Sequence, residues 1–314
     1  MRYSDVFNKK SSRILLGTAY FGDGISEEES FGIMDKFCEM GGTHIDTARL
    51  YADGVAEEIV GKWVRSRKAT HIQVSTKGGY PYAYSIDCPR LSEEEIRSDL
   101  EKSLKATGFE KIDFYWLHQD DKKLPVGQII EVLNSLVQEG KIIDFGVSNW
   151  TVERIKEAQK YAKEHGLKEI SASQLRFNPA VMNPDDRYSH LVGMDRESFA
   201  FYKENNLPVA AYSSQAKGFF SKMSELGADS LSQKAKDRYL NDVNMKTLKV
   251  LEEFSQKYSC SIASIICSAF CSLDIPEVFP IIGGRNIEQI TDSMKGAEIT
   301  LTNDEVKKVL HTVM

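Results

Sequence analysis

The feature that most constrains the fold of this 314-residue chain is a regular alternation of short apolar runs with longer helical patterns. Eight runs are rich in β-branched and aromatic residues and have apolar side chains on both faces, which is typical of buried parallel strands. With helices between them, such strands favour an α/β fold, a (β/α)8 TIM barrel. The predicted strands are Arg13–Thr18, His44–Thr47, Ile72–Lys77, Ile112–His118, Ile142–Asn149, Ile170–Gln174, Pro208–Ser213 and Val278–Gly283.

Helix signals lie between the predicted strands. Ser92 and Glu95 form a capping box at the start of one segment, and Gly140 follows the end of another, where a helix commonly stops. The predicted helices are Ser26–Met40, Ser92–Ala106, Val126–Glu139, Thr151–Lys163, Asp195–Asn205, Asn244–Tyr258, Ile287–Lys295 and Thr302–Thr312.

A doubly wound sheet is the alternative architecture. It is disfavoured because no G-x-G-x-x-G follows the first strand. Since an α/β barrel fills about 250 residues or more, we expect residues 1–314 to form a single domain. Two connections are long, Arg176–Met194 and Ser214–Val243, and long loops after barrel strands usually shape a site.

Chemically capable side chains stand at the carboxyl ends of the predicted strands, the end at which barrel enzymes build their sites. Each has an ordinary explanation by itself: Asp46 can cap a helix, Lys77 can extend to solvent, and His118 can be a bonded core histidine. Their repetition at successive strand ends favours one shared site. The residues are Thr18, Asp46, Lys77, His118, Ser148 with Asn149, Gln174, Tyr212 with Ser213, and Gly283.

Tyr51 lies in the loop after the second predicted strand and is the candidate proton donor of this site. A free tyrosine has a pKa near 10, and a neighbouring ammonium such as Lys77 would lower it. Asp46 can hold Lys77 protonated, and His118 can hydrogen-bond a substrate oxygen. Such a group would protonate an alkoxide forming from a carbonyl, which requires a hydride donor.

The remaining strand-end residues suit a nicotinamide. Ser148, Asn149 and Gln174 offer a hydroxyl and two amides to a carboxamide, and Tyr212 can stack on a flat ring.

From about Ile14 to Val309 the chain resembles the aldo-keto reductases, and among them the bacterial aryl-alcohol dehydrogenase-like oxidoreductases. Gly42–Gly61 resembles the family's D-T-A-x-x-Y followed by E-x-x-V-G. The other matching segments are STKGG, DFYWLHQDD, IIDFGVSNW, SQLRFNP, VAAYSSQAKGFF and PIIGGRNIEQITDSM.

The resemblance implies a barrel that binds an extended NADPH, with Asp46, Tyr51, Lys77 and His118 as a catalytic tetrad and Tyr51 as the acid. It implies that Ser148, Asn149 and Gln174 hold the carboxamide and that Tyr212 lies under the ring. By position, Thr18, Ser213, Gln215 and Lys217 would lie along the ribose and diphosphate, and Arg285, Gln289, Asp292 and Ser293 would lie at the adenosine end. Gly283 is also expected to bind the cofactor.

Five positions depart from the family pattern. Ser214 and Gln215 replace the usual proline and leucine, and Asp292 and Ser293 replace Glu and Asn. Gly283 stands where some members have a lysine, so we expect Arg285 to contact the 2′-phosphate and NADPH to be preferred over NADH. The ordinary explanation of Arg285 is a solvated arginine at a helix start.

Composition excludes several classes. The net charge of −6 lacks the basic footprint of a nucleic-acid binder, and no apolar run reaches the roughly 18 residues of a membrane span. The polar N-terminus and five cysteines without C-x-x-C indicate a cytoplasmic chain with reduced thiols. The sequence contains no cluster of His and Cys residues that would indicate a metal site.

Aromatic residues after the strands suggest the substrate pocket: Tyr20, Phe21, Tyr80 and Trp150, with Tyr82 and Tyr84 as further candidates. Flat side chains predict broad specificity for small-molecule carbonyls, including sugars, dicarbonyls and aryl aldehydes. Two other functions remain open, a non-catalytic NADP-binding regulatory subunit and a lyase that uses Lys77 as a Schiff base. The sequence gives no oligomeric state.

Overall fold

Eight parallel strands close into a barrel in the computed structural model, which describes residues 1–7, 9–81, 90–184 and 191–314. Each strand pairs with its neighbour in chain order, and β10 closes the ring by pairing with both β9 and β3. The barrel strands are β3 (Leu15–Gly17), β4 (His44–Asp46), β5 (Gln73–Gly78), β6 (Ile112–Leu117), β7 (Ile142–Ser148), β8 (Ser173–Arg176), β9 (Val209–Tyr212) and β10 (Val278–Ile282). The predicted barrel is confirmed, with each strand overlapping its predicted range.

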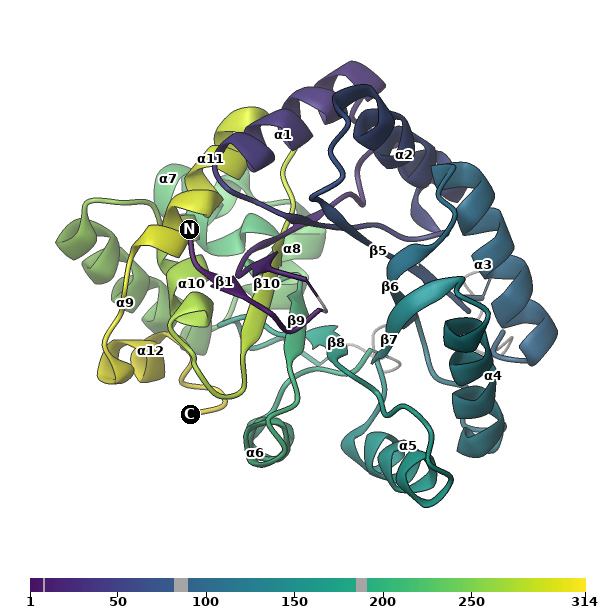
Figure 1. Cartoon of the computed structure of the whole chain (residues 1–314). Coiled ribbons are helices and arrows are strands. Elements are labelled where there is room, and N and C mark those ends of the chain that lie inside the picture. Colours follow the sequence, from purple (N-terminus) through teal and green to yellow (C-terminus); the bar gives the residue numbers. More distant parts are fainter. Residues whose placement is uncertain (8, 82–89, 185–190) are drawn as a thin grey trace.

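Helices surround the strands on the outside of the barrel (Figure 1). They bury apolar faces against it, as the parallel architecture requires. Their bounds are α1 Glu27–Glu39, α2 Val55–Arg67, α3 Glu93–Thr107, α4 Val126–Gln138, α5 Val152–Glu164, α6 Arg196–Glu204, α7 Phe219–Leu226, α8 Gln233–Tyr239, α9 Asp242–Tyr258, α10 Ile262–Cys271, α11 Ile287–Lys295 and α12 Asn303–Val309. Among these helices none combines the length and the apolar character needed to cross a membrane.

The predicted set of helices was incomplete. The set omitted α2 and α10, and the connection Ser214–Val243 contains two helices, α7 and α8. Helix α2 begins without a side-chain cap, and its buried face includes a glutamate, Glu57, so the usual start signal and polarity pattern are both absent. The capping box of Ser92 and Glu95 is present, and Gly140 takes the left-handed φ of 71° after α4.

The N-terminal segment fills the barrel interior at the end opposite the strand carboxyl termini. A short hairpin of β1 (Tyr3–Ser4) and β2 (Ser11–Ser12) precedes β3. Phe7, between them, is buried with its ring centroid 5.1 Å from that of Phe114 and 5.0 Å from that of Phe279. This aromatic plug leaves the carboxyl ends of the strands as the open end of the barrel.

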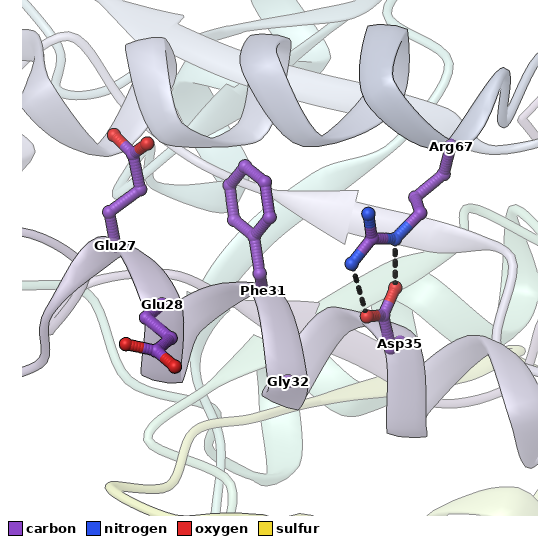
Figure 2. Close-up of a pocket in the computed structure, with 6 residues that line it drawn as sticks. All are labelled: Glu27, Glu28, Phe31, Gly32, Asp35 and Arg67. Atoms are coloured by element: carbon purple, nitrogen blue, oxygen red, sulfur yellow. Dashed lines mark hydrogen bonds and ion pairs between the residues drawn. The ribbon is translucent and has the colours of Figure 1, made fainter.

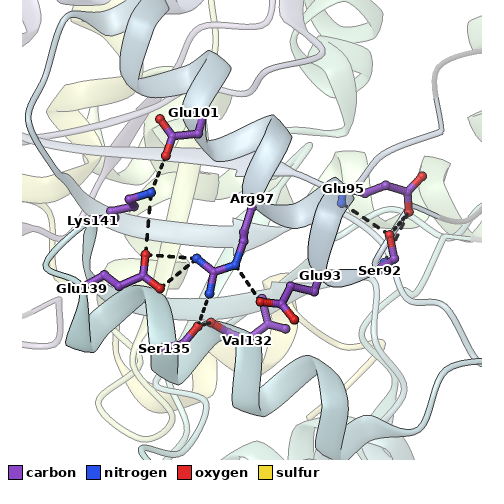
Figure 3. A network of polar contacts seen from close by, with 9 residues as sticks. All are labelled: Ser92, Glu93, Glu95, Arg97, Glu101, Val132, Ser135, Glu139 and Lys141. Atoms are coloured by element: carbon purple, nitrogen blue, oxygen red, sulfur yellow. Dashed lines mark hydrogen bonds and ion pairs between the residues drawn. The ribbon is translucent and has the colours of Figure 1, made fainter.

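An ion-pair network joins α3 to α4 on the outer surface (Figure 3). The Arg97 guanidinium donates to Glu93 on its own helix at 2.8 Å, and to Glu139 at 2.8 and 3.0 Å. A third branch donates to Ser135 Oγ at 2.8 Å. Arg97 therefore holds a charged network on the outside of the barrel.

Candidate active site

A buried ion pair lies at the centre of the site. Lys77 Nζ, at the end of β5, donates to Asp46 Oδ2 at 2.5 Å, and both side chains are almost completely buried. The same ammonium donates to the Thr47 carbonyl at 2.7 Å and lies 3.3 Å from Tyr51 Oη. Strands β4 and β5 are adjacent in the barrel, so their carboxyl ends bring these groups together.

The pKa shifts follow from burial and charge. Burial raises the pKa of the Tyr51 phenol, and although the Lys77 charge acts to lower it, the net shift is upward. The expected lowering of the Tyr51 pKa is therefore wrong for this structure, because desolvation outweighs the ammonium. Burial disfavours the charge of Lys77, but Asp46 and then Tyr51 reverse that effect and leave the pKa of Lys77 raised. At neutral pH both groups carry their protons.

His118 lies beside Tyr51 at the end of β6. Their ring centroids are 6.1 Å apart in an edge-on arrangement, and the ring of Tyr80 is 5.0 Å from His118 on another side. Burial, and then the charge of Lys77, lower the pKa of His118 well below its usual value. Nδ1 is buried and has no hydrogen-bond partner within the described ranges. His118 is thus a neutral imidazole able to hydrogen-bond an oxygen between it and Tyr51.

Two residues that the sequence analysis did not single out, Ser75 and His44, form a hydrogen-bonded chain that ends at the Asp46 carboxylate. Ser75 Oγ donates to Asp46 Oδ1 at 2.8 Å and lies 3.0 Å from His44 Nε2. Because the serine proton goes to the carboxylate, His44 donates Nε2–H to the serine, and its Nδ1 accepts from Ser11 at 3.2 Å. The sequence contains a signal for these two residues. His44 and Ser75 stand two positions before Asp46 and Lys77, and strand residues two apart face the same side.

The residues expected to hold a carboxamide gather at the ends of β7, β8 and β9. Asn149 Nδ2 donates to Ser148 Oγ and to the His118 carbonyl, each at 3.2 Å, and Asn149 Oδ1 accepts from Tyr212 Oη at 2.7 Å. Gln174 Nε2 donates to Asp46 Oδ1 at 3.2 Å. These amide groups already form hydrogen bonds within the protein, so a bound ligand would replace those internal hydrogen bonds with its own.

The segment after β9 turns sharply. Ser213 and Lys217 both adopt left-handed backbone angles, with φ of 51° and 56°. Gln215 Nε2 donates to Ser293 Oγ at 2.9 Å, which joins this turn to α11. Lys217 is exposed, and the buried Thr18 donates to the Asp46 carbonyl at 3.2 Å.

Arg285 lies on the open side of this region. Its guanidinium lies 4.6 Å from the centre of the Tyr20 ring, and its backbone N–H donates to Gln289 Oε1. A Cβ added at Gly283 would have as its nearest neighbour the Gly17 carbonyl oxygen, 4.0 Å away, so the chain is open there. The Asp292 carbonyl accepts from Ser264.

The predicted substrate pocket needs correction. Trp150 and Phe21 are 0% and 1% exposed and belong to the hydrophobic core, so neither presents a surface to a ligand in this structure. Tyr20 is 36% exposed and Tyr80 is partly exposed. Tyr82 and Tyr84 lie outside the described residues. Among the predicted pocket residues that the structure describes, Tyr20 and Tyr80 therefore keep an accessible aromatic surface.

A hollow on the outer surface lies elsewhere, between α1 and α2 (Figure 2). It has a volume of 610 Å³, and Arg67 crosses it to make a two-point ion pair with Asp35 at 2.9 and 2.8 Å. The remaining lining is Glu27, Glu28, Phe31 and Gly32. Within the described part of the chain, no group of His, Cys, Asp and Glu is arranged to hold a metal.

Residues 13–312, nearly the whole chain, match the aldo/keto reductase family. The chain belongs to the aldo/keto reductase family. The resemblance drawn from the sequence motifs is thus confirmed, and the chain is an oxidoreductase of this family.

Several known proteins are similar to this chain in sequence or in fold. Norsolorinic acid reductase B of Dothistroma septosporum is 27% identical over 95% of this chain and 77% of its own length. An aryl-alcohol dehydrogenase of Pestalotiopsis microspora is 24% identical over 94% of this chain and 75% of its own. An aldo-keto reductase of Klebsiella pneumoniae, solved with NADPH, is 22% identical with a TM-score of 0.70, covering 96% of this chain and 90% of its own.

Proposed function

We propose that this protein reduces aldehydes or ketones to alcohols with NADPH, and that Tyr51 is the general acid. The observation that carries the proposal is the position of the Lys77 ammonium, which lies 2.5 Å from the Asp46 carboxylate and 3.3 Å from the Tyr51 hydroxyl. The Lys77 ammonium and the Tyr51 phenol both carry protons at the mouth of the barrel, so they can stabilise and protonate an oxygen on which negative charge develops.

The residues would act on the carbonyl oxygen. NADPH, when bound, supplies the hydride that the carbonyl carbon accepts. Tyr51 gives its proton to the oxygen as negative charge develops there, and the product is the alcohol. Lys77 stabilises the phenolate that Tyr51 becomes, and Asp46 keeps Lys77 charged. His118, being neutral, donates a hydrogen bond that fixes the carbonyl oxygen near Tyr51.

The donor set fits the cofactor. Ser148, Asn149 and Gln174 have the hydroxyl and amide groups that a carboxamide needs, and Tyr212 has an aromatic face for the ring. Arg285 is exposed and can pair with a 2′-phosphate through two parallel hydrogen bonds. The remaining contacts to the ribose, diphosphate and adenosine fall to Thr18, Ser213, Gln215, Lys217, Gly283, Gln289, Asp292 and Ser293.

Aryl carbonyls are the substrate class we favour. The relatives include proteins named as aryl-alcohol dehydrogenases and norsolorinic acid reductases, and Tyr20 and Tyr80 offer flat surfaces near the mouth. Schiff-base chemistry at Lys77 is disfavoured, since the raised pKa keeps its amine protonated and non-nucleophilic.

The test is loss of reduced-nicotinamide absorbance with aryl aldehydes, dicarbonyls and sugars, alongside NADPH binding followed by fluorescence. We expect turnover with at least one aryl aldehyde. Binding of NADPH without turnover of any carbonyl would instead indicate a non-catalytic cofactor-binding subunit. Trapping of a carbonyl on Lys77 by borohydride would indicate a lyase.

A further inference from the structure

The loop that carries Tyr51 has an unfavourable backbone. Ala52 and Asp53, directly after Tyr51, have φ of 48° and 51°, a left-handed conformation that residues with a Cβ seldom adopt. Gly54 follows with φ of 92°. Such conformations persist only where surrounding contacts impose them.

Those contacts come from Arg49. Its guanidinium donates to the Asp53 carbonyl at 2.7 Å and to Glu57 Oε2 at 3.2 Å. Its backbone N–H donates to the Lys77 carbonyl at 3.0 Å. Gly54 lies so close to the guanidinium that a Cβ there would be 1.4 Å from Nη1. Arg49 therefore ties the chain on both sides of Tyr51.

Glu57 anchors this arginine to the strand of Lys77. The carboxylate is completely buried, and its Oε1 accepts from Thr76 Oγ1 at 2.6 Å. Successive strand residues point to opposite faces, so Thr76 faces α2 while Lys77 faces the barrel interior. The chain of contacts from Asp53 through Arg49 and Glu57 to Thr76 thus ends one residue from the ammonium beside Tyr51.

We propose that Arg49, Glu57 and Thr76 are positioning residues that hold the Tyr51 hydroxyl at Lys77 and so set the rate of proton transfer. This inference rests on the proposed function, in which Tyr51 is the acid. The three residues act only through the loop, because Arg49 contacts the loop backbone and Thr76 lies on the outer face of β5.

The test compares Arg49→Lys and Thr76→Val with Arg97→Lys, a control that alters an arginine–carboxylate network on the outer surface (Figure 3). Arg49→Lys keeps the charge but loses the two-point fork, and Thr76→Val removes only a hydroxyl. We expect Arg49→Lys to lower kcat by about tenfold or more, with KM and NADPH affinity changed less than about twofold, since misplacement of a reacting group acts on the chemical step. Thr76→Val should show a smaller loss of the same kind. Arg97→Lys should keep the wild-type kcat.

A double-mutant cycle separates positioning from general damage. Without the Tyr51 hydroxyl there is nothing to position, so Arg49→Lys should cost no further activity in a Tyr51→Phe background. A full second loss would overturn the proposal, as would an Arg49→Lys enzyme with wild-type kcat. If Tyr51→Phe itself keeps wild-type turnover, the proposed function has failed at its acid.

A spectroscopic measurement does not depend on turnover. In protein carrying 13Cζ-tyrosine, the Tyr51 resonance is the one absent from Tyr51→Phe. We expect that resonance to shift or split in Arg49→Lys and to remain in place in Arg97→Lys. An unchanged Tyr51 resonance in Arg49→Lys would show that the contacts do not hold the phenol.

Discussion

Lys77 and Asp46 form an ion pair with an N···O distance of 2.5 Å, and their side chains are 0% and 2% exposed. Removing one partner of such a buried pair destabilises the fold more than removing both, because the remaining partner is then a buried charge without compensation.

We therefore predict that Asp46→Asn lowers the free energy of unfolding by about 3–5 kcal/mol, because Lys77 remains buried without its carboxylate. Adding Lys77→Met to Asp46→Asn should recover part of that loss, since the buried charge is then gone. Urea unfolding at neutral pH measures both variants. A double variant less stable than Asp46→Asn would show that the charge of Lys77 is not the source of the cost.

His44 should make the fold sensitive to acid. Burial, followed by the charges of Lys77 and Lys9, lowers the pKa of His44 from 6.5 to about 3. Below pH 6.5 the unfolded chain binds a proton at this position and the folded chain does not. Stability should therefore fall as pH decreases from 6.5 towards 3, by about 1.4 kcal/mol per pH unit from this residue.

His44→Gln tests this dependence, because an amide can donate to Ser75 and accept from Ser11 without titrating. We expect urea unfolding between pH 6.5 and 4.5 to show a smaller loss of stability in His44→Gln than in the wild type. His165→Gln, at an exposed position, is the control. Equal slopes in His44→Gln and wild type would contradict a buried neutral His44.

Arg285 should set the choice of cofactor. The 2′-phosphate of NADPH pairs with a guanidinium, so we predict a preference for NADPH over NADH of at least about tenfold, or 1.4 kcal/mol. Arg285→Ala should reduce this ratio mainly by weakening NADPH binding, and Arg285→Lys should lie between. Fluorescence titration with both nucleotides measures the ratio, and an unchanged preference in Arg285→Ala would mean that Arg285 makes no phosphate contact.

The aromatic residues near the mouth should separate into two kinds. Tyr80→Ala should raise KM for a bulky aryl aldehyde more than for a three-carbon aldehyde, since Tyr80 is partly exposed beside His118. Trp150→Ala should instead lower stability by about 3–5 kcal/mol, as for other large core side chains. Its KM values for both aldehydes should change by the same factor. Steady-state kinetics with the two aldehydes would contradict this division if Trp150→Ala discriminated between them and Tyr80→Ala did not.

Much of the architecture could be predicted from the sequence because strand ends in a closed parallel barrel share one face. Asp46, Lys77 and His118 needed only the strand pattern to be grouped, and the structure brings them together. Helix α2 was missed because it follows three residues with left-handed backbone angles, Ala52, Asp53 and Gly54, and has no side-chain cap that a sequence pattern would reveal.

The site details depended on backbone turns and burial that the pattern does not contain. Asn149 leaves β7 with φ of 59°, so the alternation of side chains along the strand cannot be extended to Trp150, which turns into the core. The pKa of Tyr51 depends on a balance of desolvation and charge, and the sequence reveals only the charge. The Arg49–Glu57 contact likewise requires the folded loop.

The most direct test of the central claim, that Tyr51 is the acid, is the single-turnover rate of hydride transfer by Tyr51→Phe with saturating NADPH and an aryl aldehyde. The ring is kept and only the transferable proton is removed. Because a positioned general acid contributes about 10²–10⁴-fold, we expect the rate to fall by that factor while NADPH affinity is unchanged. A Tyr51→Phe rate above about a tenth of the wild-type rate would contradict it, since that loss is too small for a general acid.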